Sequence, residues 1–331
     1  MPRIFLTHTD HARATFFGAG NLKSICELGR VSMNTSGRVL CGEELAEAAK
    51  DAQIILLDRQ TPADSVFLRQ VPKLAALLSC VVDLRRVDLV AADSLGILVT
   101  RSRPFYAEAV AELAIGMMID LARGISSAQT AWPDQPVPRL GRQLAGATIG
   151  IVGYGLIGRH LAACTEALGM RVYFYDPSVE ACRPEHRKVP LRELLTVSDY
   201  VVCLMSVAVG APALFNARSF TVMKPGSFFI NLSRAGAVDE DALATALDSG
   251  HLAGAALDVG SGPDELPPRA LAKRADVIAT PHIGGLTPEA AFTQSAFVVK
   301  QTATLISGEQ PPEAVNPAAA SRIKELFGKG A

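Results

Sequence analysis

The fold of this chain is decided by the stretch Ala147-Thr148-Ile149-Gly150-Ile151-Val152-Gly153-Tyr154-Gly155-Leu156-Ile157-Gly158. An apolar, β-branched run leads directly into the pattern Gly-x-Gly-x-x-Gly, and a helix-forming run, 159–168, follows. Gly153 allows a tight turn out of a strand, Gly155 lets the backbone approach a pyrophosphate, and Gly158 lets the helix pack closely on the sheet. The N–H groups and positive dipole at the helix N-terminus also favour phosphate. The stretch therefore predicts a dinucleotide-binding turn.

A second strand, Arg171-Val172-Tyr173-Phe174-Tyr175, follows the helix and ends at Asp176. Asp176 lies 18 residues after Gly158, close to the spacing expected for an acid that hydrogen-bonds the adenosine ribose. A glycine-rich turn alone is a weak signal, but here strand, glycines, helix, strand and acid come in order. Because a carboxylate in this place repels a 2′-phosphate, the sequence predicts NAD rather than NADP as the cofactor.

Length and charge exclude several classes of function. The 331 residues suggest two domains of ordinary size. The net charge is −1, so neither a nucleic-acid nor a membrane partner is expected. No apolar run reaches the roughly 18 residues of a spanning helix, and the N-terminal apolar run is too short for a signal peptide. The six cysteines are scattered without a Cys-x-x-Cys pair, which is typical of reduced residues in a cytoplasmic protein and predicts no metal site.

Residues 1–100 alternate between apolar strands and amphipathic helices. Strands are expected at 3–7, 54–57, 74–78 and 97–100, and helices at 21–28, 43–50, 64–70 and 87–95. Alternation of this kind produces a parallel sheet flanked by helices. The first hundred residues therefore predict a small α/β domain of their own.

A break at Arg101-Ser102-Arg103-Pro104 precedes a long predicted helix, 106–123, with one buried apolar face. The next segment, 126–142, contains the single tryptophan, Trp132, and is irregular and long for a connection. Two interpretations stay open, an exposed loop and an intersubunit contact. The second is preferred, and it predicts a homodimer formed through the nucleotide domain and this arm.

From residue 147 onward the pattern is again strand and helix. Six strands are expected, at 147–152, 171–175, 200–204, 228–232, 255–259 and 277–280. This number matches the doubly wound dinucleotide-binding sheet. A helix from Glu289 to about Ser307 follows, and the chain ends in a predicted helical segment, 321–327.

Three further stretches each follow one of these strands. They are Asn231-Leu232-Ser233-Arg234-Ala235-Gly236-Ala237-Val238-Asp239-Glu240-Asp241-Ala242-Leu243, Gly254-Ala255-Ala256-Leu257-Asp258-Val259 and Thr280-Pro281-His282-Ile283-Gly284-Gly285. Together with 153–158 they closely resemble the D-isomer-specific 2-hydroxyacid dehydrogenases, the group that includes phosphoglycerate, glycerate and D-lactate dehydrogenases. The resemblance covers roughly residues 40–310 and is most specific in 147–285.

The resemblance implies an α/β protein with two doubly wound parallel-sheet domains. One is a Rossmann NAD-binding domain over residues 103–299. The other is a smaller flavodoxin-like substrate domain over residues 1–102, completed by about 300–331. Closure of the two domains is expected to exclude water from the hydride path.

The resemblance also assigns roles to single residues. Arg234 takes the place of the arginine that binds the substrate carboxylate and carbonyl, a two-point contact that suits a planar guanidinium. His282 takes the place of the acid that protonates the carbonyl oxygen, for which an ordinary histidine pKa of about 6.5 is suitable. Asp258 takes the place of the aspartate that hydrogen-bonds the nicotinamide amide. Taken singly, such residues are more often solvated caps or core side chains, but four motifs in register favour the functional interpretation. The expected cofactor contacts are Gly153, Tyr154, Gly155, Leu156, Ile157, Gly158, Asp176, Ser233, Asp258 and Gly284.

One departure from the family pattern concerns the partner of His282. After Leu-Asp-Val the family continues Phe-x-x-Glu-Pro, and that glutamate pairs with the histidine and raises its pKa. Here the chain continues Gly260-Ser261-Gly262-Pro263-Asp264-Glu265, so that Pro263 occupies the glutamate position. A one-residue shift of this glycine-rich loop would bring Asp264 to His282, and Glu265 is the less favoured substitute. The remaining alternative is a site in which no carboxylate partners His282.

A second departure concerns the substrate loop. The family uses Gly-x-Gly-x-Asp-Asn, whose N–H groups grip the substrate carboxylate, whereas this chain has Val81-Val82-Asp83-Leu84-Arg85-Arg86. Without glycines the backbone cannot approach a ligand so closely. Either the arginines of this region form a basic substrate wall or they face solvent. The first alternative gives the substrate-binding residues Arg59, Val82, Asp83, Arg85 and Arg234.

These patterns predict an NAD(H)-dependent oxidoreductase that transfers hydride between nicotinamide and a D-2-hydroxy acid or 2-oxo acid, with anionic and phosphorylated substrates among the candidates. The alternative is an NAD(H)-binding sensor or co-regulator with impaired catalysis. The missing glutamate and glycine loop favour that alternative, whereas the intact Arg234 and His282 oppose it. The enzyme is the preferred interpretation.

Overall fold

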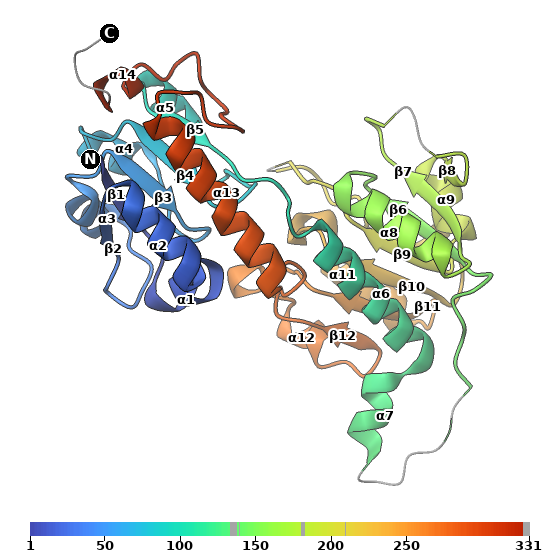
Figure 1. Cartoon of the computed structure of the whole chain (residues 1–331). Helices are drawn as coiled ribbons and strands as arrows, with labels where there is room; N and C mark the ends of the chain where they lie inside the picture. The colour runs from blue at the N-terminus through green and yellow to red at the C-terminus, as the bar shows by residue number, and fades with distance from the viewer. Residues whose placement is uncertain (133–137, 139, 180–182, 209, 327–331) are drawn as a thin grey trace. The chain divides into compact units, whose positions relative to one another are not determined.

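The computed structural model describes residues 1–132, 138, 140–179, 183–208 and 210–326. The chain divides into two compact units, Met1–Phe105 with Thr287–Ala331, and Tyr106–Leu286. Each unit holds one parallel sheet with helices on both faces (Figure 1). The predicted fold class, two doubly wound α/β domains, is therefore confirmed.

The first unit contains a five-stranded sheet in the order β2-β1-β3-β4-β5. Its strands are β1 (Arg3–Leu6), β2 (Arg30–Met33), β3 (Ile54–Leu57), β4 (Ala76–Ser79) and β5 (Leu98–Thr100). Because successive side chains of a strand face opposite sides, Ile4 and Leu6 belong to one core cluster and Phe5 to the other. This strand order is the flavodoxin-like one, in which the chain reverses its direction of winding between β1 and β3.

Helices cover both faces of this sheet. The helices of the first unit are α1 (Asp10–Phe16), α2 (Gly18–Leu28), α3 (Gly42–Ala49), α4 (Ser65–Gln70), α5 (Leu89–Ser94), α13 (Pro288–Ile306) and α14 (Ile323–Leu326). Ile25 of α2 and Val298 of α13 are fully buried against one face. Leu45 of α3 and Phe67 of α4 are buried against the other. The expected domain end near residue 299 falls inside α13, and the structure places that whole helix in the first unit because its buried residues complete this core.

The second unit contains, within the residues that the structure describes, a seven-stranded sheet in the order β12-β11-β10-β9-β6-β7-β8. Its strands are β6 (Thr148–Val152), β7 (Arg171–Tyr175), β8 (His186–Lys188), β9 (Tyr200–Cys203), β10 (Ser227–Asn231), β11 (Leu252–Leu257) and β12 (Val277–Ala279). The six strands expected from the sequence are present. The short polar edge strand β8 is additional, because His186-Arg187-Lys188 carries no apolar pattern.

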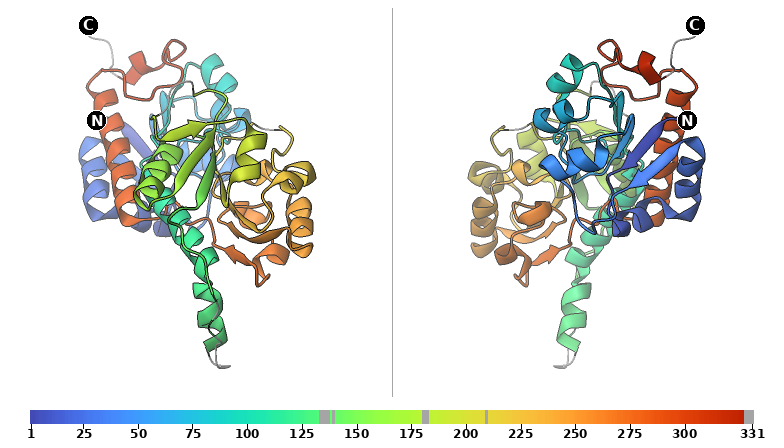
Figure 2. Two further views of the ribbon diagram at one scale, coloured as in Figure 1. Left: turned by 90° about the vertical axis from the view of Figure 1, so that its right-hand side faces the viewer. Right: turned by 90° about the vertical axis from the view of Figure 1, so that its left-hand side faces the viewer.

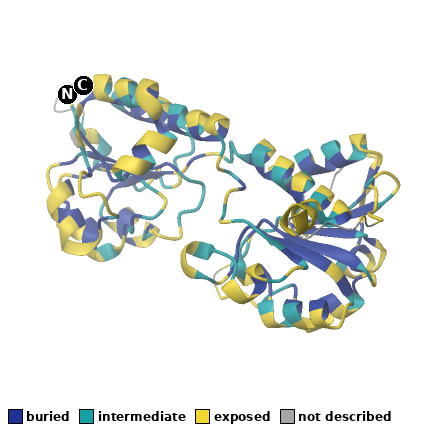
Figure 3. Cartoon of the chain, turned by 90° about the horizontal axis from the view of Figure 1, so that it is seen from below, coloured by how far each residue is buried: buried dark blue, intermediate teal, exposed yellow. Residues whose placement is uncertain are grey.

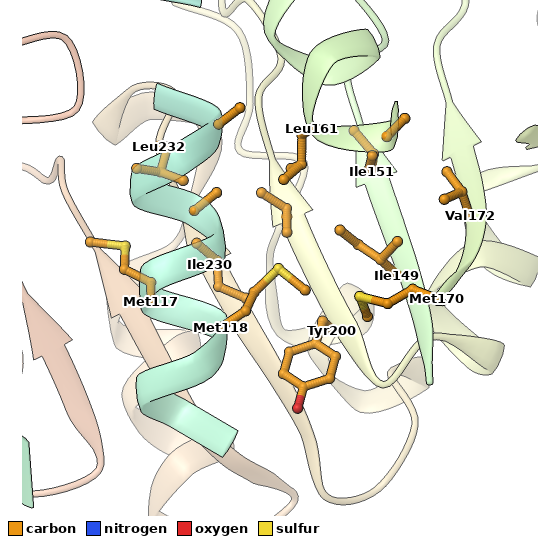
Figure 4. Packing of buried hydrophobic residues seen from close by; sticks show 14 of the residues in the cluster. Met117, Met118, Ile149, Ile151, Leu161, Met170, Val172, Tyr200, Ile230 and Leu232 are labelled. Atoms are coloured by element: carbon orange, nitrogen blue, oxygen red, sulfur yellow. The ribbon is translucent and has the colours of Figure 1, made fainter. Parts of the chain in front are cut away.

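The helices of the second unit also form two layers. They are α6 (Ala107–Arg123), α7 (Ile125–Ala131), α8 (Leu156–Ala167), α9 (Leu191–Val197), α10 (Ala217–Val222), α11 (Glu240–Asp248) and α12 (Arg269–Ala272). Met117 and Met118 of α6 pack over Ile149 of β6 and Ile230 of β10 (Figure 4). Each large apolar side chain buried in this way contributes on the order of 2 kcal/mol. Leu194 of α9 is buried in the cluster on the opposite face.

The pattern of burial follows these layers. The central strands are buried along their length, whereas the helices expose their outer faces to solvent (Figure 3). None of the helices in the described part of the chain combines the length and apolar character needed to cross a membrane.

The segment 126–142 differs in part from its expected irregular form. Gly124, in the left-handed region at φ 64°, ends α6, and α7 follows at once. Figure 2 shows α7 extending away from the sheet of its own unit. Residues 133–137 and 139, which belong to the predicted intersubunit arm, lie outside the described residues.

Candidate active site

The dinucleotide turn begins where β6 ends. Gly153 has a φ of +100°, in the left-handed region that favours glycine. A Cβ at Gly153 would lie 2.7 Å from the backbone of Leu204, and one at Gly158 would lie 2.3 Å from the Gly153 carbonyl oxygen. At Gly155, in contrast, a Cβ would meet nothing within 4 Å. The fold itself requires two of the glycines, whereas Gly155 keeps the space beside the turn clear for a ligand.

Two further features of this turn suit NAD. The N-cap of α8, Gly155, makes no side-chain capping bond, so the first-turn N–H groups of the helix are not satisfied by a cap. Asp176 accepts hydrogen bonds of 2.8 Å from the N–H of Tyr154 and from the N–H of Ser178, one on each carboxylate oxygen. Its charge is thereby fixed next to the turn, where an acid is expected to meet the ribose hydroxyls. The turn and the acid therefore fit this cofactor.

The side chains of the turn are divided between solvent and core. Leu156 is 61% exposed, whereas Tyr154 is 2% exposed. The Tyr154 ring stacks on Phe174 at a centroid distance of 3.9 Å, and its hydroxyl is hydrogen-bonded to Nδ1 of His186. The Tyr154 side chain thus anchors the turn to the sheet, and its backbone forms the surface of the turn.

Arg234 is presented by the loop after β10. Oδ1 of Asn231, the last residue of β10, accepts from the N–H of Ser233 at 3.1 Å and from its hydroxyl at 2.9 Å. The Asn231 amide donates to the carbonyl of Arg234 at 3.3 Å. The side chain of Ser233, predicted to contact the cofactor, is therefore buried and used to shape the loop that carries Arg234.

Asp258 organises the turn that carries His282. This carboxylate is 2% exposed and accepts from the Thr280 hydroxyl at 2.6 Å and from the N–H groups of Ile283 and Gly284 at 2.8 Å each. A Cβ at Gly284 would lie 2.9 Å from Oδ2 of Asp258, which explains the glycine. The sequence predicted cofactor contacts for Asp258 and Gly284; the structure adds this anchoring role, which the sequence did not reveal.

His282 itself has an unusual backbone. Its φ is +56°, a left-handed conformation that non-glycine residues rarely adopt and that is common at functional sites. The N–H of His282 donates to the Thr280 carbonyl at 3.0 Å. Its side chain remains 20% exposed, and Nδ1 lies 3.8 Å from Oε2 of Glu265. The imidazole is thus held half-buried beside a carboxylate.

Glu265 links the two predicted catalytic groups. Its other oxygen, Oε1, lies 4.0 Å from Nε of Arg234. Asp264 and Glu265 both have left-handed backbones, with φ of 56° and 63°, and this pair of residues turns the loop. Asp264, the favoured substitute in the sequence, stays exposed. The structure thus brings Glu265, the less favoured alternative, to His282, and it does not bring Asp264 there.

The predicted substrate residues of the first unit share one edge of its sheet. Arg59 follows β3, whereas Val82, Asp83 and Arg85 follow β4, the neighbouring strand. Asp83 accepts from the Arg85 N–H at 3.0 Å, and its other oxygen lies 2.7 Å from the Arg85 Nε. This pair offsets the charge of Arg85, so the edge is less basic than its sequence suggests.

A buried pair at the same edge was not predicted. Nε2 of His8, after β1, lies 3.8 Å from a carboxylate oxygen of Asp58, after β3. Burial lowers the pKa of His8 to about 4, although Asp58 raises it, and Arg13 lowers it further. Nδ1 of His8 has no hydrogen-bond partner among the described residues. A histidine next to an apolar strand gave no sequence signal for this pairing.

Comparison with known proteins decides the family. Residues 115–284 match the model of the D-isomer specific 2-hydroxyacid dehydrogenase, NAD binding domain. The chain is 35% identical over 286 residues to the D-3-phosphoglycerate dehydrogenase of Escherichia coli (strain K12), an alignment that covers 81% of this chain and 68% of that protein. The chain belongs to the D-isomer specific 2-hydroxyacid dehydrogenase family. The NAD-binding domain predicted from residues 153–158 and Asp176 is thereby confirmed.

Two further comparisons concern the length of the chain relative to a relative and its fold. The D-3-phosphoglycerate dehydrogenase of Rattus norvegicus is 33% identical over 285 residues, which cover 84% of this chain and 53% of that protein. The chain thus spans about half the length of this dehydrogenase. The apo-structure of D-lactate dehydrogenase from Escherichia coli has a TM-score of 0.79 at 24% identity, covering 95% of this chain and 100% of that chain. This likeness supports the fold of the family.

No group of three or more His, Cys, Asp or Glu side chains in the described ranges is arranged to hold a metal ion. The candidate site comprises the predicted cofactor turn, 153–158, and the neighbouring side chains of Arg234, Glu265 and His282.

Proposed function

We propose that this chain is an NAD(H)-dependent oxidoreductase that interconverts a D-2-hydroxy acid and a 2-oxo acid. One observation carries the proposal. The Glu265 carboxylate lies within 4.0 Å of the guanidinium of Arg234 and within 3.8 Å of the imidazole of His282. Glu265 therefore lies beside both Arg234, a cation that can bind a substrate carboxylate, and His282, a group that can transfer a proton.

The chemistry of these side chains suits the reaction. The guanidinium of Arg234 offers N–H donors in a planar fork, which can hold the carboxylate and the carbonyl oxygen of a 2-oxo acid. The protonated imidazole of His282 gives its proton to that carbonyl oxygen in reduction, and the neutral imidazole removes the hydroxyl proton in oxidation. Glu265 favours the protonated form of His282. NAD(H), when bound at residues 153–158 and Asp176, supplies or accepts the hydride.

The first unit is proposed to add contacts to an anionic substrate. Arg59, Val82, Asp83 and Arg85 lie at the carboxyl edge of its sheet, and ligands of open parallel sheets bind at that edge. Arg59, after β3, and Arg85, which pairs with Asp83 after β4, supply the positive charge that this proposal uses.

Turnover tests the proposal. Purified protein with NADH is screened against a panel of 2-oxo acids, including phosphorylated ones, and active substrates are then tested with Arg234→Ala. The variant is expected to lower kcat/KM by at least about a hundredfold, the usual effect of removing one partner of a charged pair, while its Kd for NADH stays close to that of the wild type. Arg192→Ala, which removes an exposed arginine of α9, is the matched control and should retain activity. Loss of NADH binding and turnover together in Arg234→Ala would contradict the assigned role.

A sensor that binds NAD(H) is the second candidate. The glycine-free loop 81–86 favours it, because that backbone cannot approach a carboxylate as a glycine loop does. Binding of NADH without turnover of any 2-oxo acid in the panel would favour this function over the dehydrogenase.

We further propose a cytoplasmic homodimer formed through the second unit. Ile119, Ile125 and Trp132 are large apolar residues that are 37%, 56% and 69% exposed. With Arg123, Ala128 and Gln129 they line a pocket of about 400 Å³ on α6 and α7. Contiguous apolar surface of this kind marks contact sites. Sedimentation of the full chain tests the dimer, and a monomer mass would contradict it.

The compartment is proposed from the cysteines. The thiols of Cys26, Cys41, Cys80, Cys164 and Cys203 are not in disulfides, which supports a reducing compartment.

A further inference from the structure

The loop that carries Glu265 is held by a second glutamate, Glu240. The N–H of Ser261 donates to Oε1 of Glu240 at 2.9 Å, and the Ser261 hydroxyl donates to Oε2. Both carboxylate oxygens are therefore used on one residue of the loop. Glu240 is the first residue of α11, where the N-cap Asp239 accepts from the N–H of Ala242 at 3.0 Å. The clamp on Ser261 is thus built on a capped helix.

Hydrogen bonds across the loop connect Ser261 to Glu265. The N–H of Gly260, next to Ser261, donates to the Glu265 carbonyl at 2.9 Å, and the N–H of Gly262 donates to the Leu266 carbonyl at 2.8 Å. A Cβ at Gly260 would lie 2.7 Å from Cα of Pro267 and 2.8 Å from Oε1 of Glu240. The segment from Gly260 to Leu266 is thus closed on itself by backbone hydrogen bonds and is tightly packed at Gly260.

Two other charged side chains of the site, Asp258 and Arg234, also make hydrogen bonds outside this loop. Asp258 binds the N–H of Ile283, the residue after His282, from the end of β11. Arg234 donates to the Ser233 carbonyl at 2.7 Å. Glu265, whose carboxylate lies 3.8 Å from the His282 imidazole, belongs to the loop that Glu240 holds through Ser261.

We propose that Glu240 is a positioning residue for proton transfer. Through Ser261 it holds Glu265 in its left-handed backbone conformation and so fixes the carboxylate beside the His282 imidazole. The inference deepens the proposed function, because it assigns Glu240 a part in the same site. It also accounts for a loop that has Pro263 at the position of the family glutamate and supplies the carboxylate from Glu265, two residues later.

An NMR titration of His282 tests the inference in the full chain without turnover. The imidazole signal is assigned by its loss in His282→Gln. Glu265→Gln is expected to lower the titration midpoint by on the order of one pH unit, because a nearby carboxylate favours the imidazolium. Glu240→Ala should lower it in the same direction and nearly as far. The double variant should show no further shift than Glu265→Gln alone, since both changes act through one contact.

Two variants separate positioning from a general loss of structure. Asp241→Ala removes the adjacent, exposed acid in the same first turn of α11 and should leave the midpoint unchanged. Glu240→Gln keeps one oxygen for the N–H of Ser261, so its midpoint should lie between those of the wild type and Glu240→Ala. If Glu240→Ala does not fold, Ser261→Ala, which removes one bond of the clamp, replaces it and should shift the midpoint partway.

Two outcomes would overturn the inference. One is a wild-type midpoint in Glu240→Ala, or in Ser261→Ala, while Glu265→Gln shifts it. The other is an equal shift in Asp241→Ala, which would trace the effect to the helix and not to the clamp. Because the titration needs no substrate, a chain that reduces no 2-oxo acid would contradict the proposed function and still leave this result readable.

Discussion

The carboxyl edges of the two sheets are built in different ways. In the second unit the loops after β6, β11 and β12 require glycine at 153, 260 and 284, where a Cβ would lie within 2.9 Å of another atom. In the first unit the loops after β1, β3 and β4 depend on pairs of side chains, His8 with Asp58 and Asp83 with Arg85. Close backbone approach can be predicted from glycine, whereas side-chain pairing across strands depends on packing that no local pattern shows.

The largest expected effect is a difference between two glycines of the turn after β6, Gly153 and Gly155. Gly153→Ala forces a Cβ to 2.7 Å from Leu204 at a φ of +100°, so we expect a loss of several kcal/mol of folding stability. Gly155→Ala meets no atom within 4 Å and should melt like the wild type, but it should weaken NADH binding by at least about tenfold, because the methyl group enters the space kept for phosphate. Thermal melting and NADH fluorescence titration measure both.

Each of these two variants has an outcome that would contradict the role given to its glycine. Wild-type stability in Gly153→Ala would show that the turn does not need its glycine for folding. Wild-type NADH affinity in Gly155→Ala would show that this face of the turn does not receive the cofactor.

The next largest effect belongs to the edge of the first unit. Burial holds the pKa of His8 at about 4, below its value of 6.5 in the unfolded chain. As the pH falls from 6.5 toward 4, the unfolded state therefore binds a proton that the folded state does not, and stability is lost by on the order of 3 kcal/mol. Above pH 6.5 this group causes no loss.

Denaturant unfolding at pH 7.5 and pH 4.5 measures this effect. The advantage of the wild type over His8→Gln should shrink by about 2 to 3 kcal/mol between the two pH values. His11→Gln, which replaces an exposed histidine of α1, should follow the wild type. Parallel behaviour of the wild type and His8→Gln would show that the buried pair does not couple to folding.

Much of the fold could be predicted because apolar periodicity marks buried elements. The strand 54–57 was placed at its observed bounds, since Ile54-Ile55-Leu56-Leu57 is buried on both faces. The edge strands β2 and β8 were missed, because edge strands carry exposed polar residues such as Arg30 and Arg187. The helix α7 was missed for the opposite reason: it has no buried residue to give it a pattern.

The residues of the candidate site were predictable to different extents. Arg234 and His282 could be placed because each follows a recognisable strand. Glu265 could not, because the loop turns through two successive left-handed residues, Asp264 and Glu265, neither of which is a glycine. The nearby Gly260 and Gly262 signalled a closely packed loop, but they do not specify which carboxylate it delivers.

The central claim is that the Glu265 carboxylate joins Arg234 and His282 in one proton-transfer site. The pH dependence of NADH-linked 2-oxo acid reduction tests this role most directly. In the proposed reaction, reduction needs protonated His282, and a carboxylate 3.8 Å from the imidazole is expected to favour that form. Glu265→Gln should therefore move the basic limb of kcat/KM to lower pH by about one unit, equivalent to about 1.4 kcal/mol. Asp264→Asn, which alters the exposed neighbouring acid, should leave the limb in place. A basic limb that moves in Asp264→Asn and stays fixed in Glu265→Gln would contradict the account.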